Sequence, residues 1–399
     1  MASFILKPGR EKSVLRRHPW IFSGAIQQAD SNIASGATVD VLSSKGEFLA
    51  RGAYSPQSQI RIRAWTFNGE PIDKDFFRKR IRASLNGRSP LLLGEGSRVR
   101  FTNAIRLIYA ESDGIPGLIV DRYEDILVLQ SLTAGSEYWK ETIADLLLEE
   151  TGLKNIYERS DADVRELEGL TSKAGIMRGT IPDSPMTITE YGLKFLVDIE
   201  HGHKTGFYLD QRANRQRVRT LAKDKDVLDC FCYTGGFTVN ALAGDAKSVL
   251  SVDASAEALT LARQNVELNK LPIEKAQFLE GDVFQVLRKF RDEGRTFDMI
   301  ILDPPKFAPT AAQADKAARG YKDINLLAFK LVRSNGILVT FSCSGGVDAA
   351  LFQKIIAGAA LDANVDAQII EHLSQAGDHP ISLHFPEGAY LKGLVCVRK

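Results

Sequence analysis

The sequence of 399 residues lacks any apolar run near the roughly 18 residues of a membrane-spanning helix. Its longest apolar stretches, such as residues 336–341, have the length of a strand. The N-terminal residues lack the apolar core of a signal peptide, and four cysteines are too few for a disulfide framework in a chain of this length. We therefore expect a cytoplasmic protein with reduced thiols.

Net charge is also nearly absent, at +1, but its distribution is uneven. Residues 1–110 hold 18 Lys and Arg against 8 Asp and Glu, whereas the remainder holds 33 against 42. A basic first part on an acidic remainder predicts contact with a polyanion. The alternative is a chance cluster of solvated surface charge.

The chain shows no internal repeat and no low-complexity tract, and its patterning indicates three domains. Residues 1–72 contain short strands separated by turns that bear glycine, which predicts a small β-barrel or sandwich. In residues 59–65 polar and apolar side chains alternate. If Ile60, Ile62 and Ala64 face inward, Arg61 and Arg63 share an outer face that could contact phosphates.

Residues 73–190 mix helical and strand patterns and predict a compact α+β domain. From residue 191 to residue 399, apolar strands such as 226–229, 248–253 and 297–303 alternate with helices. This pattern predicts a doubly wound, largely parallel, Rossmann-like sheet, whose ligands bind beyond the carboxyl ends of the strands.

The residues after the first of these strands suit a cofactor loop. Asp229 is followed by a turn with two adjacent glycines, Gly235 and Gly236, which allow close approach of a ligand to the backbone. The turn lacks the G-x-G-x-x-G spacing that binds dinucleotides. Pyrophosphate binding is therefore disfavoured.

Acidic residues end the next two strands. Asp253 is placed to accept hydrogen bonds from ribose hydroxyls, and Asp282 from an adenine amino group. Each alone is more often a helix cap. Aspartates at three successive strand ends instead favour an adenosyl cofactor without pyrophosphate, S-adenosylmethionine.

Two further strand ends carry groups for methyl transfer. Asp303 precedes two prolines that stiffen the turn, and Lys306 occupies the position where amino-group methyltransferases carry a stacking aromatic residue. Cys343 follows the next strand. Carbon 5 of a pyrimidine becomes nucleophilic when a thiolate adds to carbon 6 and a proton or hydrogen bond reaches N3. Cys343 and Asp303 supply such a pair, whereas Cys230, Cys232 and Cys396 are interpreted as small buried residues.

The remaining candidate sites are weaker. His201 and His203 lack accompanying ligands at metal spacing, so we predict no metal. Residues 204–212 suit a loop over the methyl donor, and the mixture of cations with Trp20 near the N-terminus suits looped RNA. The expected donor contacts are Phe231, Tyr233, Gly235, Gly236, Phe237, Asp253, Asp282, Asp303, Pro304, Tyr208, Gln211 and Arg212. The expected RNA contacts are Arg10, Lys12, Arg16, Arg17, Trp20, Arg61, Arg63 and Lys306.

Seven motifs distributed along the chain match one known family. They are residues 10–13 (REKS), 17–25 (RHPWIFSGA), 201–206 (HGHKTG), 208–212 (YLDQR), 233–237 (YTGGF), 303–307 (DPPKF) and 341–344 (FSCS). In these motifs the whole chain resembles the bacterial RlmI family of large-subunit rRNA cytosine-5 methyltransferases. The resemblance implies an RNA-binding PUA domain, a small central domain and a Rossmann-like methyltransferase domain. It further implies methylation of one cytosine in 23S rRNA with S-adenosylmethionine, with Cys343 as nucleophile and Asp303 as the carboxyl that reads and protonates the base.

Three other functions stay open on the residues alone. The first is an amino-group methyltransferase acting on RNA or protein, which Lys306 disfavours. The second is a nicotinamide-dependent oxidoreductase, which the missing glycine spacing disfavours. The third is a non-catalytic RNA-binding scaffold. The target cytosine, the form of the rRNA substrate, the oligomeric state and the base for the C5 proton are left unassigned.

Overall fold

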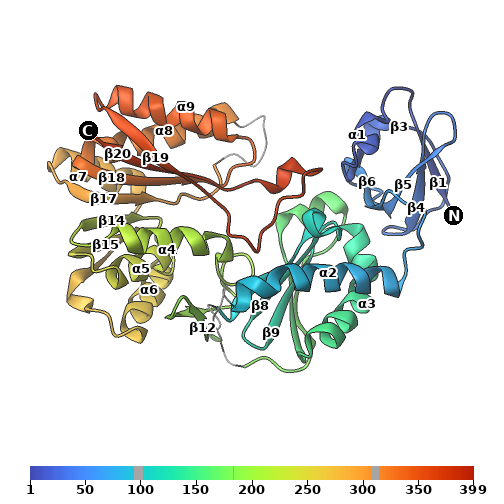
Figure 1. Ribbon diagram of the computed structural model, residues 1–399, viewed down its shortest axis with the longest axis horizontal. Helices are drawn as coiled ribbons and strands as arrows, with labels where there is room; N and C mark the ends of the chain where they lie inside the picture. Colours follow the sequence, from blue (N-terminus) through green and yellow to red (C-terminus); the bar gives the residue numbers. More distant parts are fainter. Residues whose placement is uncertain (94–101, 183, 308–313) are drawn as a thin grey trace. The chain divides into compact units, whose positions relative to one another are not determined.

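The computed structural model describes residues 1–93, 102–182, 184–307 and 314–399, which form two compact units (Figure 1). The first unit contains residues 1–189, 197–209 and 377–388, and the second contains residues 190–196, 210–376 and 389–399. The division passes through the hairpin of β12 (Met186–Glu190) and β13 (Leu193–Val197). The predicted domain boundaries at residues 72 and 190 stay predictions.

The N-terminal part of the first unit is a six-stranded sheet in the order β2-β6-β5-β4-β1-β3. Strand β1 pairs with β4 in parallel, and the other neighbours pair antiparallel. Its core includes Phe4, Leu6, Val39, Val41 and Ile62. The elements are β1 (Ser3–Leu6), α1 (Lys12–Leu15), β2 (Trp20–Phe22), β3 (Ile26–Ala29), β4 (Thr38–Leu42), β5 (Phe48–Tyr54) and β6 (Ile60–Thr66).

The rest of the first unit is built on a five-stranded sheet in the order β11-β10-β9-β8-β7. Strands β9 and β10 are parallel because α3 connects them, and the remaining pairs are antiparallel. Helices α2 and α3 pack against the sheet and against each other. The elements are α2 (Lys74–Leu93), β7 (Ala104–Tyr109), β8 (Leu118–Tyr123), β9 (Ile126–Ser131), α3 (Ala134–Thr151), β10 (Asn155–Ser160) and β11 (Lys173–Arg178).

The two sheets of the first unit are joined through one face of β5 and β6. Ala53 and Trp65 belong to the same buried cluster as Phe77 and Ile143, and the Trp65 and Phe77 rings lie 5.3 Å apart. Strand β6 is therefore covered on two sides, by the core of its own sheet and by the central domain. This double coverage overrides the simple inside–outside alternation expected for a half-buried strand.

The second unit contains a seven-stranded sheet in the order β16-β15-β14-β17-β18-β20-β19. The first five strands in this order are parallel, and β20 runs antiparallel to both β18 and β19. The strands are β14 (Asp226–Cys230), β15 (Ser248–Asp253), β16 (Ala276–Glu280), β17 (Phe297–Leu302), β18 (Val332–Ser342), β19 (Ala367–Ser374) and β20 (Lys392–Arg398).

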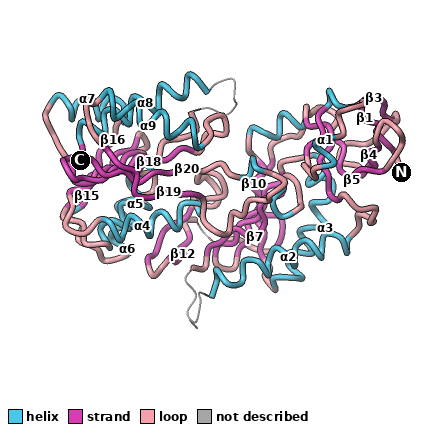
Figure 2. Tube along the Cα trace, turned by 45° about the horizontal axis from the view of Figure 1, so that its top comes forward, coloured by secondary structure: helices cyan, strands magenta, loops and turns pink. Residues whose placement is uncertain are grey.

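Helices cover both faces of this sheet, with α4, α5 and α6 on one face and α7, α8 and α9 on the other (Figures 1 and 2). The helices are α4 (Arg212–Leu221), α5 (Gly236–Ala243), α6 (Ala256–Leu268), α7 (Val283–Asp292), α8 (Ala314–Leu331) and α9 (Ala349–Asp362). This arrangement, together with the β-rich N-terminal domain, confirms the predicted fold class. Strand order turns between β14 and β17, so the carboxyl ends of these strands form the expected ligand edge.

Candidate active site

The loop after β14 has an unusual backbone. Phe231, Tyr233 and Gly235 have positive φ values of 61°, 49° and 75°. At Gly235 an added Cβ would also lie 2.8 Å from the Cβ of Ala262, so glycine is needed on two counts. The loop leads directly into α5 at Gly236, whose side chain is a single hydrogen and leaves the backbone accessible. The sequence of this turn therefore fixes a tight strand-to-helix connection at the ligand edge.

Asp253 ends β15 and holds this loop in place. One of its carboxylate oxygens accepts a hydrogen bond from the Tyr233 backbone N–H (2.8 Å), and the other accepts from the Ser255 N–H (3.0 Å). Asp282 is exposed and caps α7 by accepting a hydrogen bond from the Gln285 N–H (2.9 Å). Asp253 thus shapes the cofactor loop, and Asp282 has the capping role that sequence also allowed. Their contacts with a donor stay predictions.

Asp229, which the sequence analysis did not select as a site residue, is fully buried at the end of β14. The Thr238 hydroxyl donates to its Oδ2 (2.7 Å), whereas its Oδ1 accepts no hydrogen bond from the described residues. Burial raises the pKa of Asp229 to about 7; the Thr238 hydrogen bond opposes this rise, and the nearby Asp303 and Asp253 charges add to it. A buried carboxylate oxygen without a partner fits a cationic ligand such as S-adenosylmethionine. The signal in the sequence was an aspartate at the end of an apolar strand.

Substituting Asp229 with Asn is expected to change how stability depends on pH. The native carboxyl has a pKa of about 7, whereas that of an unfolded aspartate is close to 3.8. Between these values the native state binds more protons than the unfolded state, so wild-type stability falls as pH rises from about 4 to about 7. The loss amounts to at most about 4 kcal/mol, and asparagine escapes it because it cannot ionise. Urea unfolding of both proteins across this window measures the difference, and a constant gap between them would contradict the assignment.

Asp303 and Cys343 follow adjacent parallel strands at the same edge of the sheet. Leu302, the last residue of β17, pairs with Thr340 of β18, and Asp303 and Cys343 come one and three residues later. Both side chains are half-buried. The strand pairing thus brings the predicted acid and the predicted thiol to one end of two neighbouring strands.

The turn after Asp303 is anchored by an aromatic side chain. Pro304 is buried, while Pro305 and Lys306 are exposed. The ring of Phe307 packs on that of Tyr321, with centroids 4.8 Å apart. The turn can therefore hold Asp303 in place while Lys306 stays accessible to RNA.

Cys343 differs from the other cysteines in its exposure. Cys230, Cys232 and Cys396 are buried, and burial raises the pKa of each thiol, in Cys396 to about 12. Of the four cysteines, all of which lie in the described residues, Cys343 alone is half-buried. A thiol needs access and ionisation to act as a nucleophile, so exposure agrees with the choice of Cys343.

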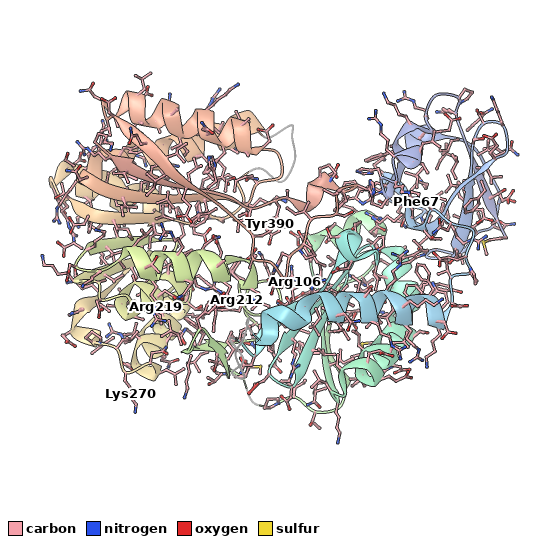
Figure 3. The ribbon with its side chains drawn as sticks, in the orientation of Figure 1. Phe67, Arg106, Arg212, Arg219, Lys270 and Tyr390 are labelled. Carbon is pink, nitrogen blue, oxygen red and sulfur yellow. The ribbon has the colours of Figure 1, made fainter. Side chains whose placement is uncertain are left out.

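The residues expected to cover the donor fall into both units. Tyr208 lies in the first unit, where its hydroxyl is 3.3 Å from His203 Nδ1 and the Lys204 ammonium lies over its ring. Gln211 and Arg212 lie in the second unit and are buried. Arg212, at the start of α4 (Figure 3), has its Nε 3.6 Å from Glu190 Oε2. These contacts give Gln211 and Arg212 a place in the interior, and their donor contacts stay predictions.

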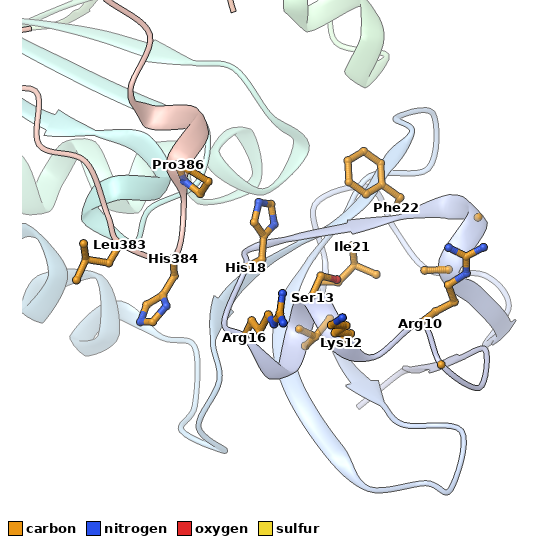
Figure 4. A pocket seen from close by; sticks show the side chains of 14 residues that line it. Arg10, Lys12, Ser13, Arg16, His18, Ile21, Phe22, Leu383, His384 and Pro386 are labelled. Carbon is orange, nitrogen blue, oxygen red and sulfur yellow. The ribbon is translucent and has the colours of Figure 1, made fainter. Parts of the chain in front are cut away.

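A groove with a volume of about 1150 Å³ lies beside the N-terminal sheet in the first unit (Figure 4). The predicted RNA-binding cations Arg10, Lys12 and Arg16 line it and are exposed. Leu383 and His384, from the segment 377–388, complete its wall. Arg17 is also exposed, next to the groove-lining residue Arg16. Exposed cations beside apolar and aromatic side chains are a combination that suits single-stranded RNA.

The prediction that Arg63 faces phosphates is wrong. Arg63 is only 7% exposed, and its guanidinium donates to Glu168 Oε1 (2.7 Å), with Glu111 3.6 Å away. The reason is the coverage of β6 by the central domain, whose acidic residues neutralise the buried charge. Arg61 is half-buried and donates to the Pro56 carbonyl oxygen.

Trp20 is likewise engaged within the first unit. Its indole N–H donates to Glu111 Oε1 (2.8 Å), and its ring packs edge-on against Phe385 with centroids 5.0 Å apart. The ring of His18 also packs against it, with centroids 5.8 Å apart. Trp20 is half-buried among these contacts, and its predicted contact with RNA stays a prediction. The indole supports the segment 377–388 from which one wall of the groove is built.

Replacing Arg10, Lys12 and Arg16 together with alanine is expected to weaken RNA binding and its salt dependence. Loss of three phosphate contacts lowers the slope of log K against log salt by about 2 for single-stranded RNA. Filter binding of an rRNA fragment at several salt concentrations measures this slope. A variant with the exposed Lys223, Lys275 and Lys354 changed to alanine is the matched control. If the slope of log K against log salt is the same in both triple variants, the groove is not the RNA-binding site.

Among the described residues, no group of three or more His, Cys, Asp or Glu side chains could hold a metal ion. His201 and His203 are exposed, and His201 Nδ1 lies 3.4 Å from Asp198. In the described part of the chain, no helix combines the length and the apolar character needed to cross a bilayer.

Comparisons with known proteins agree with this architecture. Residues 4–67 match the family model of a PUA-like domain, and residues 174–351 match that of an S-adenosylmethionine-dependent methyltransferase. Ribosomal RNA large subunit methyltransferase I of Aeromonas salmonicida is 53% identical over 397 residues, covering 99% of each chain. The protein of that name from Shewanella amazonensis is 52% identical over 391 residues, covering 98% of each.

Two solved structures share the fold over the full length of both chains. A candidate SAM-dependent methyltransferase from Streptococcus mutans has a TM-score of 0.85 at 20% identity. A candidate methyltransferase in complex with SAH has a TM-score of 0.86 at 21% identity. At this identity the likeness establishes the fold.

Proposed function

Since the chain belongs to the ribosomal RNA large subunit methyltransferase I family, we propose that it methylates carbon 5 of one cytosine in 23S rRNA through a covalent Cys343 adduct. Its cofactor is S-adenosylmethionine, and its class is S-adenosylmethionine-dependent rRNA methyltransferase. The observation that carries the finer proposal is that Cys343 and Asp303, both half-buried, follow the carboxyl ends of two paired parallel strands.

Cys343 and Asp303 act on the two sides of the cytosine ring. The Cys343 thiolate forms a bond to C6, the C5–C6 π electrons form a C4–C5 double bond, and the C4–N3 π electrons take a proton from Asp303 at N3. Carbon 5 then takes the methyl group, whose bond to the donor's sulfur breaks and leaves that sulfur uncharged. A base removes the proton from C5, the bond between sulfur and C6 breaks, and Asp303 recovers its proton from N3. Both side chains return to their starting state.

The cofactor supplies a methyl group on a positively charged sulfur. The residues proposed to hold it are the Phe231–Phe237 loop, Asp253 and Asp282. Asp229, at the strand end that leads into this loop, adds a buried carboxylate oxygen that accepts no hydrogen bond from the described residues. The Asp229 carboxyl group suits this cofactor because of charge. Its pKa is about 7, so a neighbouring cation readily favours its ionised form.

The RNA must present its target base outside the stack. Carbon 6 is inaccessible to a side chain within a helix, so the cytosine has to rotate out to reach Cys343. We assign the groove with Arg10, Lys12 and Arg16 to the flanking RNA. The protein would encounter 23S rRNA, naked or in an assembling subunit, in the cytoplasm.

The product of the reaction tests the proposal. Purified protein, labelled S-adenosylmethionine and 23S rRNA from cells lacking this protein are incubated, and the RNA is digested to nucleosides. We expect label in 5-methylcytosine. Label in an N-methylated base would overturn the C5 assignment and favour an amino-group methyltransferase, and absence of label would favour an RNA-binding scaffold.

A further inference from the structure

Lys392 lies beside the proposed nucleophile, although it is distant in sequence. It opens β20 and pairs with Ser342, the last residue of β18, so that Cys343 is the next residue along. Its side chain is half-buried, and its ammonium donates a hydrogen bond to the Ser344 carbonyl oxygen (2.7 Å). Ser342 and Ser344, the residues before and after Cys343, are thus both in contact with Lys392 of β20.

The other side of this short segment is fixed by α8. Ser344 is fully buried, and its hydroxyl lies 2.9 Å from the hydroxyl of Tyr321. The Ser344 backbone N–H donates to the Ser342 hydroxyl (3.3 Å). With these bonds in place, the Lys392 hydrogen bond is one of several that hold the segment. Its positive charge is the property that the others do not supply.

Among the described residues, the charged or titratable groups that act on the Lys392 ammonium include Cys343 after β18, Asp348 at the start of α9, and Lys306 in the turn after β17. Burial lowers the pKa of Lys392 to about 8. The positive charge of Lys306 lowers this pKa further, whereas Cys343 and Asp348 raise it. Asp348 also caps α9, accepting from the Leu351 N–H (2.7 Å). The lysine therefore stays largely protonated at pH 7, next to the thiol.

We infer that Lys392 is a positioning residue for the reaction, whose ammonium stabilises the Cys343 thiolate and so prepares it for addition to C6. The inference rests on the proposed function, because it gives Cys343 the role of nucleophile. A neighbouring cation favours the ionised form of a thiol. Water takes the thiol proton, and the thiolate keeps its charge until the bond to C6 forms. Lys392 keeps its own proton throughout, so it is distinct from the base that removes the C5 proton.

Alkylation of Cys343 by iodoacetamide tests the inference without any methyl transfer. The rate of carbamidomethylation at Cys343 is followed by mass spectrometry between about pH 5 and pH 10 in wild type, Lys392→Met and Lys392→Arg. Methionine keeps the length and removes the charge, whereas arginine keeps the charge. For Lys392→Met we expect a titration midpoint about one unit higher and an alkylation rate at pH 7 about tenfold lower. Lys392→Arg should stay close to wild type.

An unchanged midpoint in Lys392→Met would overturn the inference, as would a uniform change of rate at every pH, which indicates a loosened segment. If Lys392→Met fails to fold, Cys343→Ser gives the reciprocal measurement. Loss of the thiolate should lower the Lys392 pKa further and raise acetylation of Lys392 by acetic anhydride at pH 7 severalfold. Equal acetylation of Lys392 in Cys343→Ser and wild type would count against coupling of Lys392 and Cys343. Should Cys343→Ala still transfer methyl, the proposed function fails, while the alkylation profile still decides whether thiol and ammonium are coupled.

Discussion

The Cys343→Ala variant is expected to lose methyl transfer to rRNA by at least about a thousandfold, the scale on which enzymes lose activity when a nucleophile is removed. Without the sulfur, C5 of cytosine cannot gain the electron density that attack on the methyl group needs. The half-buried side chain lies outside the main core cluster, so alanine leaves the fold intact. Calorimetric binding of S-adenosylmethionine should therefore be unchanged while product formation stops.

The matched control for this variant is Cys396→Ala, which removes a thiol from β20 of the same sheet. Cys396 is buried in the core, and its replacement should lower stability modestly and leave methyl transfer in place. Substantial residual transfer by Cys343→Ala and Cys343→Ser would exclude the covalent mechanism. It would also remove the reason for a cysteine at the end of β18.

The Asp121→Asn variant is expected to lose about 3–5 kcal/mol of unfolding free energy, the usual result of removing one partner of a buried ion pair. Asp121 is fully buried on β8, and the guanidinium of Arg106 on β7 (Figure 3) donates to both of its oxygens, at 2.8 and 2.7 Å. Asparagine removes the negative charge to which that buried guanidinium donates. Urea unfolding at pH 7 measures the loss.

The same carboxylate also anchors the loop of residues 201–206. The Thr205 hydroxyl donates to Asp121 Oδ2 (2.6 Å), and the Tyr123 hydroxyl lies 2.9 Å from that of Thr205. Burial and the Asp121 charge raise the pKa of Tyr123, so it stays a neutral donor. Loss of Asp121 should therefore loosen this loop, seen as faster backbone hydrogen exchange around Thr205.

Asp125→Asn is the control, because Asp125 is exposed and lies in the turn after the same strand. Its effect should be within about 0.5 kcal/mol of wild type, as for most surface substitutions. Equal stability of Asp121→Asn and Asp125→Asn would show that the Arg106 pair contributes nothing net to folding. Normal hydrogen exchange at Thr205 in Asp121→Asn would separate the loop from the ion pair.

The sequence predicts those site residues that are chemically reactive and also follow the end of a strand. Apolar strands mark their own ends, and parallel pairing brings all carboxyl ends to one edge, so strand periodicity is enough to predict that Asp253, Asp303 and Cys343 lie near one another. Asp229 also ends a strand, but nothing in the sequence around it shows that it will be fully buried. Its raised pKa, and an oxygen that accepts no hydrogen bond from the described residues, exist only once the sheet excludes water.

The surroundings of Lys392 and Arg63 could not be predicted from the sequence. Nothing in the local sequence shows that Lys392 will lie beside Cys343, because the antiparallel return of β20 alongside β18 spans about fifty residues. The alternation in β6 placed Arg63 on an outer face, but Glu168, from 105 residues further along the chain, covers it. Such contacts depend on which surfaces meet after the elements have formed.

The sequence alone therefore determined the fold class and the cofactor, because these depend on local periodicity and on residue types at strand ends. The roles of Cys343 and Asp303 come from the same strand ends and stay predictions. The tertiary structure decided which charges are accessible and which are neutralised, as in the exposed Arg10 and the buried Arg63. It also decided which groups meet across the sheet, as the Lys392 ammonium and the Ser344 carbonyl oxygen do. Burial and electrostatic coupling depend on the distances between segments that are remote in sequence, and a local sequence pattern contains no information on those distances.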